Sequence, residues 1–388
     1  MNRRHDLDWV RVLAFGVLVL YHVGMYYVSW DWHVKSPQAG PALEPFMLMS
    51  APWRLGLLFL VSGAATAFLL RKRQQGFLGS RSLRLLLPLV VGMLIVVAPQ
   101  AYYEVVEQLP GGYRDGFWAF YGRYLSADES FCDQDDCLTV PTWNHLWFVA
   151  YLWVYTVLLW LGAKLMPAAL VERLQTGLER ALSGLGLIVW PFALLAVARV
   201  ALVTRFESTH ALVDDWYNHA QYLPLFLLGF AMARMDAIWP ALWRSRWVAL
   251  ALALASYVAI ATYFTSFSEA NPPPQALRIA MRTVWALNQW CAMAAILGFA
   301  WRFREADSAA LRYLVPAVFP IYILHQTIIV ALAHHLKPAA ITPMIEGPLL
   351  VIATFALCFA GYELIRRVAL LRPLFGLPWK AAKPDARA

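Results

Sequence analysis

Charged side chains are scarce in this sequence of 388 residues. Only 14% of the residues are charged and 61% are hydrophobic, whereas a soluble domain contains about 25% charged and about 45–50% apolar residues. So few charges are not enough to cover the surface of a soluble fold of this size. Low charge with high hydrophobicity is also the opposite of the composition of disordered chains. The composition excludes both classes and predicts a protein that is solvated mostly by lipid.

Several common sequence motifs are also missing. The sequence has no P-loop, no glycine-rich dinucleotide motif and no G-x-S-x-G nucleophile turn. It contains no H-E-x-x-H pattern and no compact group of ligand residues, so no metal is expected. No segment detectably repeats another, which argues against a transporter built from repeats.

Long apolar runs, by contrast, are frequent. A helix needs about 20 apolar residues to cross the hydrocarbon core of a bilayer. Ten such runs lie near 9–29, 53–70, 84–106, 143–164, 184–204, 219–235, 246–266, 281–301, 315–335 and 346–369. The run at 219–235 is the weakest, because it contains Pro224 and begins with polar residues. We therefore expect an all-α integral membrane protein with about ten transmembrane helices, forming one membrane-embedded domain over residues 1–388.

Basic residues are distributed unevenly over the predicted loops. With a cytoplasmic N-terminus, 22 of the 32 lysines and arginines lie inside and 8 lie outside, while Arg11 and Arg199 fall within spans. Cytoplasmic loops carry the excess of Lys and Arg, so we expect both termini in the cytoplasm. The longest outer loop is then 107–142, and residues 373–388 form a cytoplasmic tail. The formal charge of +8 is mostly this orientation signal, and nucleic acid is not an expected partner.

The chain has four cysteines. Cys132 and Cys137 are the only two outside the predicted spans, and both lie in the outer loop. A short Cys-x4-Cys segment on an oxidising face predicts a disulfide, whereas a zinc site would need further ligands nearby. Cys291 and Cys358 fall in apolar runs and are expected to be small core residues.

The first apolar run contains two ionisable residues, Arg11 and His22. Ionisable residues inside a span are expensive and are candidates for function. Eleven residues at 100° each end about 20° past three full turns, so both side chains point along one helix face, about 16 Å apart along the axis. This places Arg11 near the cytoplasmic edge and His22 beyond mid-membrane. The alternatives are a snorkelling arginine and a structural histidine that is hydrogen-bonded inside a helix bundle.

A second basic feature, Arg81-Ser-Leu-Arg84, precedes the third run. Residues three apart are neighbours on one helix face, so the two guanidinium groups lie together at the cytoplasmic edge. Paired guanidinium groups suit phosphate, which they bind bidentately. The alternative is plain anchoring of the span by positive charge on the cytoplasmic side.

A third feature is His325, near the middle of the ninth run. Tyr322 precedes it by three residues and therefore lies on the same helix face. His325 is either part of a reactive site or a core histidine that is hydrogen-bonded to this neighbouring tyrosine. The residues alone leave both interpretations open.

Taken in order, these features resemble the motifs of the membrane acyltransferase-3 family. The resemblance covers nearly the whole chain and rests on Arg11-x10-His22, the Phe-Leu-Val-Ser62-Gly run at 59–63, Arg81-x-x-Arg84 and Tyr322-x-x-His325. Two further segments, 29–36 and the Asn-His145-Leu-Trp-Phe run at 144–148, resemble the branch of the family that succinylates osmoregulated periplasmic glucans.

The resemblance implies a multi-pass enzyme of the bacterial inner membrane. Such an enzyme takes an acyl group, succinyl or acetyl, from acyl-CoA on the inner face and transfers it to a hydroxyl of a periplasmic or cell-surface glycan on the outer face. The implied site residues are His22, Arg11 and His325 for catalysis, Arg81, Arg84 and Arg11 for acyl-CoA, and Ser62, Tyr322 and His145 as supporting positions. The neutral His22 imidazole would act as a general base, with a covalent acyl-histidine as the alternative.

Two functions from other classes remain open at this stage. Ten spans with intramembrane charges are also compatible with a transporter that exports a glycan or an acylated small molecule. A non-catalytic membrane partner of a glycan synthase is a further alternative, although the presence of Arg11, His22, Arg81 and Arg84 argues against a decayed site. The sequence does not determine the acyl group, the acceptor glycan or the oligomeric state.

Overall fold

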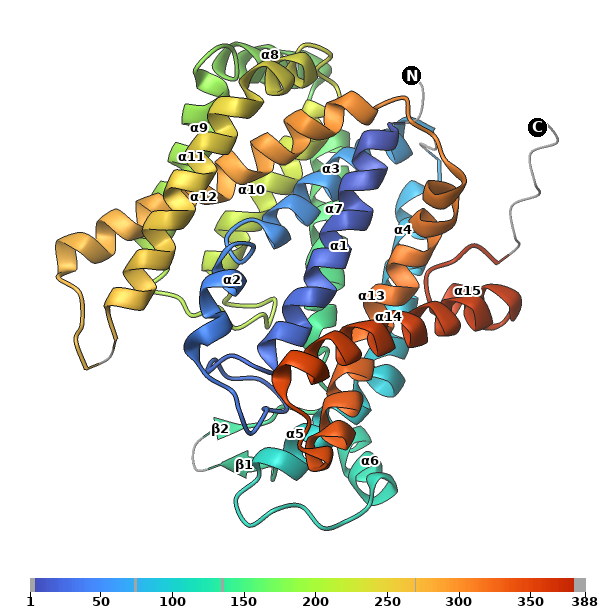
Figure 1. The fold of residues 1–388 in the computed structure, drawn as a ribbon. Coiled ribbons are helices and arrows are strands. Elements are labelled where there is room, and N and C mark those ends of the chain that lie inside the picture. The colour runs from blue at the N-terminus through green and yellow to red at the C-terminus, as the bar shows by residue number, and fades with distance from the viewer. Residues whose placement is uncertain (1–3, 73–74, 134–135, 269, 380–388) are drawn as a thin grey trace. The chain divides into compact units, whose positions relative to one another are not determined.

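The computed structural model describes residues 4–72, 75–133, 136–268 and 270–379. Its main helices are α1 His5–Met25, α2 Glu44–Leu48, α3 Arg54–Lys72, α4 Phe77–Val91, α5 Ala98–Gln108, α6 Phe117–Leu125, α7 Trp147–Leu165, α8 Ala168–Ala181, α9 Gly186–Leu202, α10 Trp216–Met232, α11 Ile238–Ser266, α12 Gln275–Ala300, α13 Ala309–Leu336, α14 Pro343–Arg367 and α15 Leu371–Leu374 (Figure 1). A π-helix over Gly92–Val96 joins α4 to α5, and 3-10 turns cover Pro41–Leu43, Asn144–Leu146, Trp301–Phe303 and Lys337–Ala339. The predicted all-α class is confirmed. Within the described part of the chain, the only strands are β1 Cys132–Asp133 and β2 Asp136–Cys137.

Every predicted apolar run falls on a helix. Among the described residues, eight helical segments are long and apolar enough to cross a membrane. A ninth arises if α8 and α9, which meet at 106°, count as one broken span. Helix α10 coincides with the weakest run and has 17 residues. The structure thus supports a multi-span protein, while ten spans remain a prediction.

The chain divides into two compact units, each made of several stretches. Unit 1 comprises 1–17, 45–78 and 151–315, and unit 2 comprises 18–44, 79–150 and 316–388. Helices α1, α7 and α13 contribute residues to both. The candidate site residues are therefore distributed over both units.

In unit 1, helix α3 packs closely on α10 because each has a glycine at the contact. A Cβ on Gly63 would lie 1.9 Å from the backbone oxygen of Phe226, and one on Gly229 would lie 1.9 Å from that of Leu60. No side chain fits at either position. Such close approach is typical of small residues at helix contacts in membranes.

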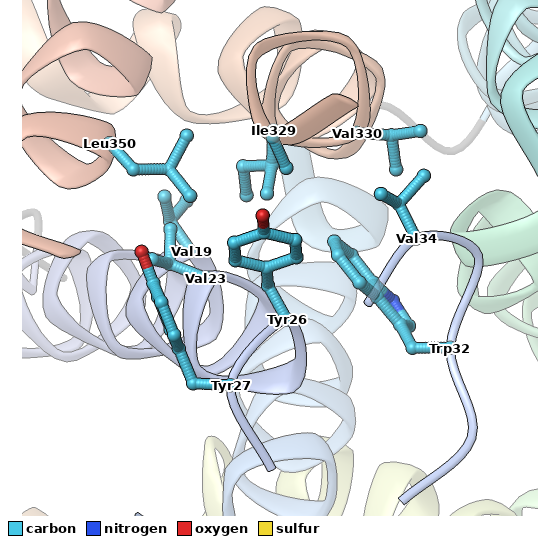
Figure 2. Close-up of a cluster of buried hydrophobic side chains, with 10 residues drawn as sticks. Val19, Val23, Tyr26, Tyr27, Trp32, Val34, Ile329, Val330 and Leu350 are labelled. Carbon is cyan, nitrogen blue, oxygen red and sulfur yellow. The ribbon is translucent and has the colours of Figure 1, made fainter. Parts of the chain in front are cut away.

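In unit 2, an aromatic and aliphatic core forms around the end of α1. Tyr26, Tyr27 and Trp32 pack against Ile329 of α13 and Leu350 of α14, together with neighbouring valines (Figure 2). These contacts hold the first helix against two late helices. The core thereby supports the part of α1 that carries His22.

Lys35 caps the carboxyl end of α1, a role that was not predicted from the sequence. Lys35 Nζ donates to the backbone oxygens of Met25 and Trp30, each at 2.7 Å, and to that of Val28. The last carbonyls of a helix have no partner inside it, so Lys35 satisfies groups that would otherwise need water. Burial lowers the pKa of Lys35.

The segment 107–142, which is the predicted outer loop, contains α6 and a disulfide. Cys132 and Cys137 are bonded to each other, as predicted, and Cys291 and Cys358 are buried thiols. Arg123, at the end of α6, donates to Asp128 at 2.6 Å. This hydrogen bond holds the pKa of the Asp128 carboxyl below its usual range.

Candidate active site

Two predicted site residues from opposite ends of the sequence meet in unit 2. His22 Nδ1 of α1 lies 2.8 Å from His325 Nε2 of α13. The two rings are stacked with 5.0 Å between centroids and 12° between planes. His325 has no exposed surface, and His22 is half-buried. Both residues are candidates from the sequence, but the hydrogen bond between them is not predictable from it.

The hydrogen bonds of His325 determine where the protons of the pair lie. His325 Nδ1 is 2.7 Å from the backbone oxygen of Tyr322, which can only accept. Nδ1 therefore carries the proton, and in the neutral ring Nε2 carries the lone pair. His22 must then donate from Nδ1 to this lone pair. In the neutral pair, the lone pair of His22 is consequently on Nε2.

His145, a predicted supporting residue, belongs to the same cluster. Its Nε2 lies 3.1 Å from the backbone oxygen of Tyr322 and 3.2 Å from that of Ile323. Its ring stands edge-on to His325, with 5.0 Å between centroids. His145 and His325 therefore share the Tyr322 carbonyl as acceptor.

Tyr322 contacts two of these histidine residues, one through its hydroxyl and one through its backbone carbonyl. Its hydroxyl donates to the backbone oxygen of His145, and its own carbonyl, not its hydroxyl, accepts from His325. The hydrogen bond between His325 and the neighbouring tyrosine is therefore present, and it is made through the tyrosine backbone. The physical reason is that residues three apart on a helix bring the carbonyl of the first close to the side chain of the second.

Gln100 of α5 is a buried residue of this cluster that the sequence analysis missed. Its Nε2 donates to Thr327 Oγ1 at 2.6 Å and lies 3.4 Å from His145 Nδ1, while its Oε1 accepts from Asn144 at 3.2 Å. The exposed fraction of Gln100 is 0%. A glutamine within the apolar run 84–106 was the available signal, because buried polar groups need partners.

The network continues from Gln100 to a fourth histidine, His33. Gln326 donates to Gln100 Oε1 at 3.2 Å, and its Nε2 lies 2.8 Å from His33 Nε2. His33 Nδ1 lies 2.7 Å from a carboxylate oxygen of Glu104. The polar cluster of unit 2 thus extends from the His22–His325 pair to an imidazole–carboxylate pair. The position of Gln326, directly after His325, was the only sequence signal for it.

The two predicted phosphate-binding arginines lie on α4 in unit 2. Arg84 is exposed, and its side chain has no hydrogen-bond or ion-pair partner among the residues that the structure describes. Its backbone oxygen lies 3.5 Å from where a Cβ on Gly376 would be, so the turn after α15 packs beside it. Arg81 is half-buried on the same helix. Arg84 is thus a cation that is available to an anionic ligand.

Arg11 and Ser62 belong to unit 1. Arg11 Nη2 donates to the backbone oxygen of Val315 at 3.3 Å and lies 3.9 Å from Asp8. This contact ties α1 to α13 within that unit. The Ser62 carbonyl accepts from Thr66 at 2.8 Å, a contact along α3. The two roles proposed for Arg11 and the supporting role of Ser62 remain predictions.

No group of three or more His, Cys, Asp or Glu side chains in the described ranges is arranged to hold a metal ion. The chemistry that the cluster itself offers is proton transfer, because a neutral imidazole can accept a proton and its partner can stabilise the resulting charge.

Comparison with known proteins places this chain in a family. A family model described as an acyltransferase domain matches residues 4–363. The proteins called glucans biosynthesis protein C of Escherichia coli strain K12, Escherichia coli O81 strain ED1a and Shigella dysenteriae serotype 1 are each 22% identical over 384 residues, which cover 96% of this chain and 94% of the relative. No solved structure matches this chain significantly.

The matched region contains the histidine pair, both α4 arginines, Arg11 and Ser62. Of the eight described helical segments that are long and apolar enough to cross a membrane, it contains seven whole and the eighth, Pro343–Arg367, up to residue 363. The chain therefore belongs to the membrane acyltransferase-3 family, and it is an acyltransferase.

Proposed function

We propose that this protein transfers an acyl group, succinyl or acetyl, from cytoplasmic acyl-CoA to a hydroxyl of a periplasmic or cell-surface glycan. The family supports the reaction class. The relatives named for glucan biosynthesis support a glycan acceptor. The observation that carries the proposal is the His22–His325 pair, because its hydrogen bonds leave a lone pair on His22 Nε2.

His22 acts as the general base. Its Nε2 removes the proton of the acceptor hydroxyl while that oxygen attacks the thioester carbonyl. The carbon–oxygen bond forms, the carbon–sulfur bond breaks, and the CoA thiolate leaves. The proton held by His22 then passes to the thiolate, so that an ester and CoA thiol are the products and the site returns to its starting state.

His325 is the positioning partner of that base. While His22 holds the extra proton, its Nδ1–H bond to His325 becomes charge-assisted and therefore stronger. The Tyr322 carbonyl keeps the His325 ring in the orientation that accepts this bond. In catalytic triads, a third group likewise fixes the tautomer and orientation of the catalytic histidine.

The donor, acyl-CoA, binds from the cytoplasmic side, where the predicted loops are rich in Lys and Arg. Arg81 and Arg84 bind phosphate oxygens of CoA, for which guanidinium groups are suited. Arg84 supports this assignment most directly, because no residue in the described part of the chain uses its charge. The protein is accordingly a multi-pass protein of the bacterial inner membrane with both termini in the cytoplasm.

The test is acyl transfer by substituted protein, measured by mass spectrometry of periplasmic and surface glycans. His22→Ala should reduce glycan acylation by about 10²–10⁴-fold, the usual contribution of general base catalysis. His325→Ala should also reduce it, whereas His325→Gln should recover part of the activity because an amide oxygen can accept the His22 proton donor.

The control is Arg173→Ala on α8 of unit 1, an exposed residue, which should leave acylation unchanged. Normal acylation by a His22→Ala protein that inserts and folds would contradict the assigned role. Glycans of a deletion strain, compared with wild type, identify both the acyl group and the acceptor by the mass that is lost.

A further inference from the structure

Helix α8 of unit 1 has the character of a helix that lies in the membrane surface. It meets α9 at 106° (Figure 1), and none of its residues is buried. Leu170, Leu174 and Leu178 are spaced by four residues and share one face, while charged residues occupy the opposite face. An amphipathic helix perpendicular to an upright apolar helix lies in the interface, with its apolar face toward the acyl chains.

An open groove of about 470 Å³ lies between α8, α9 and α10 in the same unit. Leu174 and Leu178 of α8, Trp190 and Leu194 of α9 and Leu228 of α10 are among its lining residues. Trp190 is 60% exposed. Apolar hollows of this kind are occupied by hydrocarbon rather than by water, because they offer water no hydrogen-bond partners.

One cation stands at the end of this apolar surface. Arg234, two residues after α10 ends, is the only charged residue among those that the structure places in the lining. It is exposed, and its side chain has no hydrogen-bond or ion-pair partner within the described ranges. The other polar lining residue, Gln175, donates to Glu179 at 3.2 Å. An available guanidinium at one end of a hydrocarbon-lined groove matches a ligand that has an anionic head and an apolar chain.

We propose that the groove binds a membrane phospholipid, with an acyl chain between α8, α9 and α10 and the phosphate on Arg234. A guanidinium binds phosphate bidentately and more strongly than neutral groups do. A free phosphate ion would leave the apolar lining unused, and a chain without a head group would leave Arg234 without a partner. The proposal does not depend on the acyl-transfer reaction.

The first test measures binding of phosphatidylglycerol to the purified full-length protein by native mass spectrometry in detergent. Arg234→Ala should weaken binding at the tightest site about tenfold or more, because a hydrogen bond to a charged group is lost. The matched control is Arg173→Ala, which removes an arginine of α8 that does not line the groove. Equal affinity of the Arg234→Ala and wild-type proteins would overturn the proposal.

The second test has two parts: a protein variant in which a larger side chain fills the groove, and a ligand that lacks the phosphate. Leu178→Trp should also reduce phosphatidylglycerol binding, whereas Leu170→Trp, on an exposed residue outside the lining, should not. Diacylglycerol, which has the same chains and no phosphate, should bind the wild-type protein at least tenfold more weakly. Equal binding of diacylglycerol, or full binding by the Leu178→Trp protein, would contradict the proposed occupant. Size-exclusion profiles and helical circular dichroism of all variants establish that they fold.

Discussion

The position of the proton on the neutral His22 ring follows from a backbone carbonyl that accepts a hydrogen bond from His325. The Tyr322 oxygen fixes the proton of His325 on Nδ1, and His325 Nε2 then fixes the proton of His22 on Nδ1. The reactive nitrogen of His22 is therefore the one that is not bonded to His325. Since a peptide carbonyl cannot lose or gain a proton near neutral pH, this order is stable as long as the pair is neutral. Protonation of His325 Nε2 would reverse it.

Arg84 allows a residue-scale test of donor binding. Arg84→Ala should raise the KM for acyl-CoA about tenfold or more with kcat nearly unchanged, because a phosphate contact binds ground state and transition state alike. Steady-state release of CoA thiol by the purified protein measures both constants. The double variant Arg81→Ala/Arg84→Ala should bind acyl-CoA more weakly still.

Arg367→Ala is the control for Arg84, since Arg367 is 72% exposed and is paired with Glu363 at 2.9 Å. It should leave the KM for acyl-CoA unchanged. Unchanged acyl-CoA affinity in the double variant would mean that Arg81 and Arg84 act only in membrane orientation.

At the scale of elements, the contact between α3 and α10 depends on the absence of two side chains. Gly63 and Gly229 allow the backbones to approach so closely that a Cβ would overlap a carbonyl oxygen. In a bilayer such packing is the main attraction between helices, because lipid chains are as apolar as the side chains they replace. Helix α3 also carries Ser62, so the position of this predicted supporting residue follows from the same contact.

Gly63→Ala should therefore destabilise the protein by about 1–3 kcal/mol or more, the usual cost of overpacking. The measurement is the thermal unfolding midpoint in detergent. Gly177→Ala on exposed α8 is the matched control: nothing lies within 4 Å of its Cβ position, and alanine in a helix is favoured over glycine by about 0.5–1 kcal/mol. Equal midpoints for the Gly63→Ala and wild-type proteins would contradict the close contact.

At the scale of the whole molecule, the basic residues predict an orientation in the membrane. The excess of Lys and Arg on one set of loops predicts cytoplasmic termini and an outer loop at 107–142. The disulfide between Cys132 and Cys137 agrees with an oxidising environment for that loop. The proposed transfer requires this arrangement, because donor and acceptor are on opposite sides.

Reporter fusions test the orientation. A fluorescent protein that folds only in the cytoplasm should be fluorescent when it follows residue 388, and alkaline phosphatase at that position should be inactive. In the loop 107–142 the two results should be reversed. Active phosphatase at the C-terminus would show that the predicted orientation is wrong.

Local composition was enough to determine the membrane class, the positions of the helices and the disulfide, because each of these depends on residues close together in the sequence. The residues Arg11, His22, Arg81, Arg84 and His325 were also recognisable, since ionisable side chains in or beside apolar runs are costly without a role. Only the tertiary structure decided that His22 bonds to His325, 303 residues away, that Tyr322 contributes its carbonyl, and that Gln100 connects His145 to the rest of the cluster. Such contacts depend on how whole helices rotate and pack against one another. A helix that is surrounded by lipid and by other helices is apolar on most of its faces, so its sequence pattern carries little information about that rotation.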